Sequence, residues 1–129
     1  MVTEKRKIGD VGENILVKHL MKHKYKILDK NYRKNWGEID VVASKDETIH
    51  FFEVKTIRML GGRVSGETHD PEDNVHVWKR KRMSRVIQSY LEEKRVPEEI
   101  EWQVDVAAIF LDFTLKEAKI RITEDINLN

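Results

Sequence analysis

The stretch WGEIDVVASKDETIHFFEVKT, residues 36 to 56, decides the fold of this chain. Residues 36–43 and 49–56 alternate or run apolar on either side of the short polar segment SKDET, a pattern that is typical of a β-hairpin. The second strand has the apolar character of a buried strand, yet it ends with a carboxylate and an ammonium group, those of Glu53 and Lys55. Both groups are expected on one face, because side chains alternate between the faces of a strand.

The register of this hairpin brings acidic residues together. A loop of four residues, 45–48, keeps the apolar positions of the two strands on a common face. Directly opposed residues have Cβ atoms roughly 4.5 to 5.5 Å apart, a separation at which two carboxylates repel each other. The expected pairs are Ser44 with Ile49, Val42 with Phe51, Asp40 with Glu53 and Glu38 with Lys55.

A divalent cation would remove the repulsion between Asp40 and Glu53. Hard oxygen ligands in a partly open site favour Mg²⁺ or Mn²⁺, and the backbone carbonyl of Val54 is a candidate further ligand. Such an ion polarises a phosphoryl oxygen and lowers the pKa of a bound water, while a neighbouring lysine, here Lys55, orients that water or offsets the developing charge. The pattern therefore favours metal-assisted hydrolysis of phosphodiester bonds.

The remaining elements are predicted from periodicity. Asp10 and Glu13 have capping-box spacing before a helix over residues 10–23, and a second helix is expected over 75–94. Segment 59–74, rich in glycine, is expected to be a mobile loop. Strands are predicted over 25–32, 36–43, 49–56, 101–111 and 118–123, which gives the order α-β-β-β-α-β-β and an α/β fold around a mixed sheet. In strand 101–111, the residues expected to point inward are Trp102, Val104, Val106, Ala108 and Phe110.

The composition is that of one globular domain covering residues 1–129. The formal net charge is +1, and there is no cysteine, which excludes disulfides, cysteine-ligated zinc and a thiol nucleophile. No segment approaches the ~18 apolar residues of a membrane span, so no membrane partner is expected and a cytoplasmic protein is the simplest prediction.

Two locally basic segments flank the opening stretch, at 24–35 and 78–85. The second carries basic residues beside an aromatic one along a predicted helix, which suits contact with a phosphate backbone; the alternative is the solvated face of an amphipathic helix. The candidate nucleic-acid-binding residues are Arg33, Lys34, Lys79, Lys81, Arg82 and Arg85.

The segments GEID and FFEVK, with Gly12 and Glu13 upstream, resemble the core motif of the PD-(D/E)xK nucleases, which have the restriction-endonuclease-like fold. More closely, the chain resembles the YraN family, also called UPF0102, and the archaeal Holliday-junction resolvases share the same helix and hairpin. The matching pieces are GDVGENILVKHL, ILDKNYRKNWGEIDVVA, FFEVKTIR, VHVWKRKRMSRVIQSYL and QVDVAAI. The chain departs from the family pattern at Gln103 and Val104, where arginine and phenylalanine are frequent.

The resemblance implies active-site roles for Glu13, Asp40, Glu53 and Lys55, a basic contact at Lys79, and a DNA substrate that includes branched or structured DNA. A resolvase cuts two strands, so the resemblance also implies a homodimer. The alternative function is a nucleic-acid-binding module that keeps the fold without turnover.

Several of these residues have structural interpretations. Glu13 could complete a capping box instead, and Glu38 fits a surface ion pair better than a metal site. Asp105 is expected to be a solvated or hydrogen-bonded strand residue, and His19 and His23 to face solvent.

Overall fold

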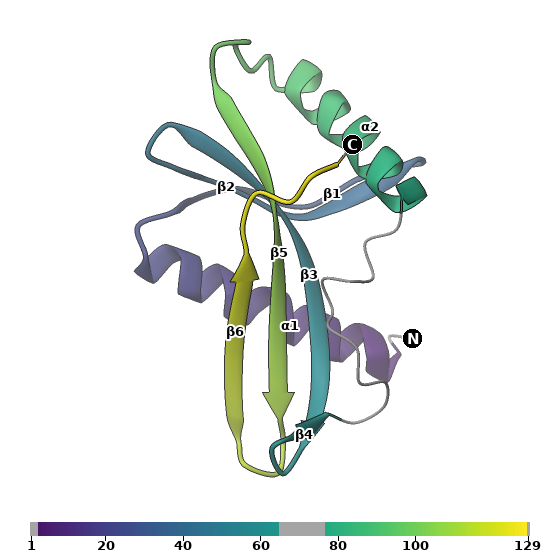
Figure 1. Cartoon of the computed structure of the whole chain (residues 1–129), viewed down its shortest axis with the longest axis vertical. Coiled ribbons are helices and arrows are strands. Elements are labelled where there is room, and N and C mark those ends of the chain that lie inside the picture. Colours follow the sequence, from purple (N-terminus) through teal and green to yellow (C-terminus); the bar gives the residue numbers. More distant parts are fainter. Residues whose placement is uncertain (1–2, 65–76, 129) are drawn as a thin grey trace.

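The computed structural model describes residues 3–64 and 77–128 (Figure 1). In the described part of the chain, no helix combines the length and the apolar character that a membrane span requires. The predicted order of elements is confirmed, with one short strand, β4, in addition. The elements are α1 (Glu4–Lys22), β1 (Lys26–Lys34), β2 (Gly37–Lys45), β3 (Thr48–Leu60), β4 (Arg63–Val64), α2 (Val77–Glu93), β5 (Glu101–Asp112) and β6 (Glu117–Thr123).

The strands form one mixed sheet, which confirms the predicted fold class. Their order is β1-β2-β3-β5-β6, and β4 pairs with the end of β3. The pairing of β3 with β5 is parallel and every other pairing is antiparallel, so the connection through α2 is the crossover that a parallel pair requires. In Figure 1, α1 runs across the long strands β3, β5 and β6, while α2 lies at the other end of the molecule, near β1 and β2.

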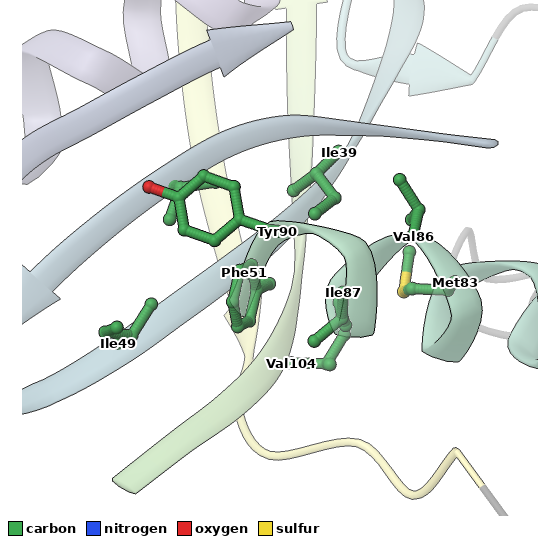
Figure 2. Close-up of a cluster of buried hydrophobic side chains, with 9 residues drawn as sticks. Ile39, Ile49, Phe51, Met83, Val86, Ile87, Tyr90 and Val104 are labelled. Carbon is green, nitrogen blue, oxygen red and sulfur yellow. The ribbon is translucent and has the colours of Figure 1, made fainter. Parts of the chain in front are cut away.

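The sheet is covered on both faces. On one face Leu16 and Leu20 of α1 pack on Val41 and Phe52. Figure 2 shows the other cluster, in which α2 packs on β2, β3 and β5; its labelled members are Ile39, Ile49, Phe51, Met83, Val86, Ile87, Tyr90 and Val104. Burial of both faces explains why the middle of β3 is almost continuously apolar.

Strand β5 lies inside the sheet, between β3 and β6, and Val104, Val106 and Ala108 are buried on the face that was expected to point inward. The other face is also covered, because Asp105, Ala107 and Ile109 have no exposed surface. Phe110, which was expected to point inward, is only half-buried. Ala107 and Ile109 are buried because they pack in the same cluster as Leu16 and Leu20 of α1.

Helix α1 starts earlier than predicted. Thr3 is the N-cap, and its hydroxyl oxygen accepts a hydrogen bond from the backbone N–H of Arg6 at 3.1 Å. Asp10 therefore lies inside the helix, where it pairs with Arg6 at 3.6 Å, and the capping-box interpretation of Glu13 was wrong. The D-x-x-E spacing misled because a carboxylate pair on a helical face has the same spacing as a capping box.

The hairpin between β2 and β3 is tighter than predicted but has the expected register near its turn. Asp46 and Glu47 form a two-residue turn, with φ of 50° and 64°. The pairs Val42 with Phe51 and Ser44 with Ile49 are confirmed, and the ladder ends at the pair Val41 and Phe52. Asp40 is thus not paired with Glu53, nor Glu38 with Lys55, so that part of the predicted register was wrong.

The first residues of the predicted loop 59–74 have regular structure. Gly61 and Gly62 turn the chain with φ of 57° and 85°, and β4 folds back on β3. The Asp112 carboxylate accepts hydrogen bonds from both glycine N–H groups and holds this turn beside the turn between β5 and β6. Residues 65–74 of the predicted loop lie outside the described residues.

The packing of α1 on β3 gives a test of this fold. A Cβ atom at Gly12 would lie 2.0 Å from the Thr56 hydroxyl oxygen, whereas nothing lies within 4 Å of a Cβ at Gly9. We expect Gly12→Ala to lower the free energy of unfolding by about 1–3 kcal/mol through overpacking. Gly9→Ala, the matched control, should raise it by up to ~1 kcal/mol through helix propensity. Urea unfolding measures both, and equal stability of the two variants would contradict this packing.

Candidate functional site

Asp40 lies at a fork in the sheet, where β2 remains paired with β1 while β3 continues beside β5. Its carboxylate Oδ2 accepts a hydrogen bond from the backbone N–H of Val54 at 2.7 Å. Ile39 packs in the same cluster as Val42, while Val41 packs on the opposite face, so the alternation of faces breaks at Asp40. The side chain thus takes the place of a backbone partner at the point where the ladder ends.

Glu53 and Lys55 flank Val54 on β3 and contact each other. The Lys55 Nζ lies 3.2 Å from Oε1 of Glu53. Glu53 is 9% exposed and Lys55 is half-buried, so this ion pair is shielded more than an ordinary surface pair. In an extended strand the N–H and C=O of one residue point to the same edge, so the Val54 carbonyl is expected to face the fork, as its N–H does.

Glu13 approaches from α1. It follows Gly12, whose lack of a side chain allows α1 to contact β3 at Thr56. Burial raises the pKa of the Glu13 carboxyl, and the negative charges of Asp10 and Glu38 raise it further. The close approach of helix and strand therefore adds a third carboxylate to the surroundings of the fork.

These side chains line one cleft of about 560 Å³ between α1, the fork of β2 and β3, and the start of α2. The structure brings together all four predicted catalytic residues and the predicted backbone ligand. They are Glu13, Asp40, Glu53, Lys55 and Val54.

The cleft also has basic residues. Lys5 and Arg6 were missed by the sequence interpretation, whereas Arg82 is one of the predicted nucleic-acid-binding residues. Lys5 and Arg6 line it from the first turns of α1, and Arg82 lines it from α2. Arg6 lies seven residues, two helical turns, before Glu13 and hence on the same side of the helix. Recognising Thr3 as the N-cap would have revealed this, because the helix then includes both basic residues.

The two predicted nucleic-acid-binding residues of β1 are engaged within the protein. An Arg33 guanidinium nitrogen lies 2.9 Å from Glu38 Oε2 on the neighbouring strand. Lys34 Nζ lies 2.8 Å from Glu93 Oε2 at the end of α2. Glu38 therefore forms the structural ion pair that was expected of it, but with Arg33 in place of Lys55.

The basic residues of α2 differ in their surroundings. Arg85 lies over the ring of Trp36 at 4.8 Å, a cation–π contact that joins α2 to the turn before β2. Lys81 is exposed, and Arg82 is exposed at the edge of the cleft. Lys79 belongs to α2, but its side chain lies outside the described residues.

The electrostatics of the fork fit a bound cation. Burial raises the pKa of Asp40 to about 7, against an ordinary value of 3.8, and the charges of Glu53, Glu13 and Glu38 act in the same direction. The hydrogen bond from Val54 opposes these effects and keeps the carboxylate aimed at the fork. Hard oxygen donors of this kind are the ligands that Mg²⁺ and Mn²⁺ prefer.

A second group of candidate metal ligands lies away from this cleft. Among the residues that the structure describes, His50, Asp105 and Glu124 have ligand atoms that all lie within 4.8 Å of one another. Of the two alternatives expected for Asp105, solvated or hydrogen-bonded, the structure confirms the second, because the residue is fully buried and hydrogen-bonded. His19 is half-buried and His23 is exposed, with their rings 4.3 Å apart.

The raised pKa of Asp40 predicts a pH dependence of stability without metal. The folded state holds the proton more tightly than the unfolded state, so stability falls as pH rises from about 4 to about 7 and stays reduced above that. Asp40→Asn should remove this loss and raise the free energy of unfolding by about 1–3 kcal/mol above pH 7. Urea unfolding across this pH range, with chelator present, measures the effect. The exposed Glu98→Gln is the control, and an Asp40→Asn variant that follows the wild-type pH curve would contradict the prediction.

Comparison with known proteins identifies relatives across nearly the whole chain. A UPF0102 protein of Alkaliphilus oremlandii is 38% identical over 120 residues, covering 93% of this chain and 97% of that protein. A UPF0102 protein of Caldicellulosiruptor bescii is 32% identical, covering 93% and 96%. Among solved structures, Pyrococcus furiosus SfsA in complex with Ca²⁺ aligns with a TM-score of 0.38 and 12% identity, over 95% of this chain and 64% of that one.

The family model described as "Uncharacterised protein family UPF0102" matches residues 12–109. These residues run from the glycine of α1 through the fork to the middle of β5 and so include the four predicted catalytic residues. With this match and relatives more than 30% identical over most of their length, the chain belongs to the UPF0102 family, as its motifs predicted.

Proposed function

We propose that this protein is a metal-dependent endonuclease that hydrolyses phosphodiester bonds in DNA, with branched or structured DNA as the candidate substrate. One observation carries the proposal: Asp40 and Glu53, two shielded carboxylates, and Lys55 line a single cleft at the fork of β2 and β3. A purely structural sheet gains nothing from a carboxylate such as that of Asp40, whose ionisation is opposed by burial and by neighbouring carboxylates. Such perturbed groups in a cleft are typical of functional sites.

The fork supplies the ligands for the metal. Asp40, Glu53 and the carbonyl of Val54 would hold Mg²⁺ or Mn²⁺ with oxygen atoms only. When bound, the ion supplies polarisation of a phosphoryl oxygen and a lower pKa for a bound water. The Val54 N–H holds Asp40 in one orientation, so the protein prepares this ligand in advance.

Other residues of the cleft serve the reaction directly. The oxygen of the attacking water bonds to phosphorus as the bond to the leaving sugar oxygen breaks, and negative charge grows on the phosphoryl oxygens. The Lys55 ammonium, held by Glu53, orients the water and offsets this charge. Glu13 accepts the proton of the water, because its raised pKa makes it a stronger base than an ordinary carboxylate.

Binding of DNA requires positive charge around this acidic centre. Arg82 of α2 and Lys5 and Arg6 of α1 line the cleft from two sides and are placed to contact phosphates next to the scissile bond. Lys81 and Arg85 would extend this basic surface along α2, and the family resemblance adds a basic contact at Lys79. Arg33 and Lys34 make a smaller contribution, because their ion pairs, at 2.9 and 2.8 Å, are closer than the 3.6 Å pair of Arg6 with Asp10 and must break before they bind phosphate.

The proposal is tested by cleavage of linear, flapped and four-way DNA with Mg²⁺ or Mn²⁺. The wild-type protein should cut at least one of these, and Asp40→Asn and Lys55→Ala should each reduce the rate by about 10² to 10⁴-fold. Lys26→Ala is the matched control for Lys55→Ala, because Lys26 is exposed and pairs near the far end of β2, and it should leave the rate unchanged.

Two results would contradict the proposal. Cleavage that persists equally in all variants would come from a contaminating nuclease. No cleavage, together with salt-sensitive DNA binding that Arg82→Ala weakens, would establish the binding module in its place.

A further inference from the structure

Three ligating side chains from distant parts of the chain converge near the start of β3. His50 lies on β3, Asp105 on β5, and Glu124 directly after β6, with their ligand atoms all within 4.8 Å of one another. His50 and Asp105 are buried, and Glu124 is exposed. His50 precedes Glu53 by three residues, about 10 Å along the strand, and the alternation of side chains directs the two to opposite faces.

Asp105 is held by donors from three directions. Its Oδ1 accepts hydrogen bonds from Gln103 Nε2 and from the backbone N–H of Asp125, both at 2.9 Å. Its Oδ2 lies 2.7 Å from Nδ1 of His50. The carboxylate is thus fixed by outer partners while one oxygen faces the histidine, as in metal sites whose ligands are oriented by a surrounding shell of hydrogen bonds.

The charge and the atom types of the group select a class of cation. Two carboxylates face one imidazole, so the group has an excess of negative charge that a divalent ion would neutralise. An imidazole nitrogen with carboxylate oxygens suits Zn²⁺, whereas Mg²⁺ prefers oxygen ligands alone. This group is therefore expected to bind a different metal ion from the all-oxygen ligands of the fork.

The geometry needs only small movements to bind such an ion. Two ligands about 2.0–2.1 Å from a tetrahedral zinc ion are roughly 3.3 Å apart, so the His50 and Asp105 ligand atoms, now 2.7 Å apart, must separate by about 0.6 Å. Glu124 is exposed and has a long side chain that can move into the third position, and water supplies a fourth ligand. The ion displaces the proton shared between His50 and Asp105.

We propose that His50, Asp105 and Glu124 form a second metal site, for Zn²⁺ or a similar borderline divalent cation, that is separate from the cleft. The site has a structural consequence. The backbone N–H groups of Asp125 and Ile126 already bond to Asp105 and to the Val104 carbonyl, the latter at 2.8 Å. A metal that also holds Glu124 attaches the segment after β6 to both central strands.

Zinc binding to chelator-treated protein tests this proposal, by calorimetry and by the thermal unfolding midpoint. The wild-type protein should bind one Zn²⁺ at this site and unfold at a higher temperature. His50→Gln and Glu124→Gln should each weaken binding at least tenfold and abolish the rise. His50→Gln keeps a donor for Asp105, and Glu124 is exposed, so at least the second variant is expected to fold normally.

Two control variants distinguish this site from others. His23→Ala removes the pair of His19 and His23 on α1, a spacing that can bind zinc adventitiously, and should leave the effect intact. Asp40→Asn should also leave it intact, so the result is independent of the proposed nuclease activity. Absence of zinc binding, or binding that is lost in His23→Ala and kept in Glu124→Gln, would overturn the proposal.

Discussion

The hydrogen bond from the Val54 N–H to the Asp40 carboxylate is the interaction on which the candidate site depends. It lies where the ladder of β2 and β3 ends, so a side chain satisfies a backbone donor that another strand would otherwise pair. It joins the separating strands and fixes Asp40 beside Glu53 and Lys55. A regular hairpin would have placed the two carboxylates directly opposite each other, whereas at the fork both line an open cleft.

Placing the Asp40 carboxylate at the fork lowers the stability of the folded protein, as is common for residues of functional sites. Burial and neighbouring carboxylates oppose ionisation of Asp40, so the protein without metal is less stable at neutral pH than its packing alone would allow. The apolar clusters on both faces of the sheet supply the stability that tolerates this cost. The close contact of Gly12 with Thr56 brings Glu13 and the basic start of α1 to the cleft. Glu13 adds to the repulsion at Asp40, and the basic residues add positive charge beside it.

The sequence predicted what depends on local pattern and missed what depends on distant partners. Apolar alternation gave the pairing of Val42 with Phe51, and the family motifs gave the four residues of the cleft. The fork was missed because the alternation of apolar and polar residues does not show where a strand pairing ends. It gave no indication that the Asp40 carboxylate, in place of a backbone carbonyl, accepts the hydrogen bond of the Val54 N–H. The burial of Asp105 was missed because its partners, at positions 50 and 125, lie far along the chain. Lys5 and Arg6 were missed because the helix was predicted to start at residue 10, whereas Thr3 is its N-cap.

The central claim is that Asp40, Glu53 and the Val54 carbonyl bind one divalent ion at the fork. The most direct measurement is the anomalous diffraction of crystals soaked in Mn²⁺. We expect one peak at about 2.0–2.3 Å from oxygen atoms of these three residues, and its loss in Asp40→Asn crystals. A site that remains without a peak at saturating Mn²⁺, with the cleft open to solvent in the crystal, would contradict it.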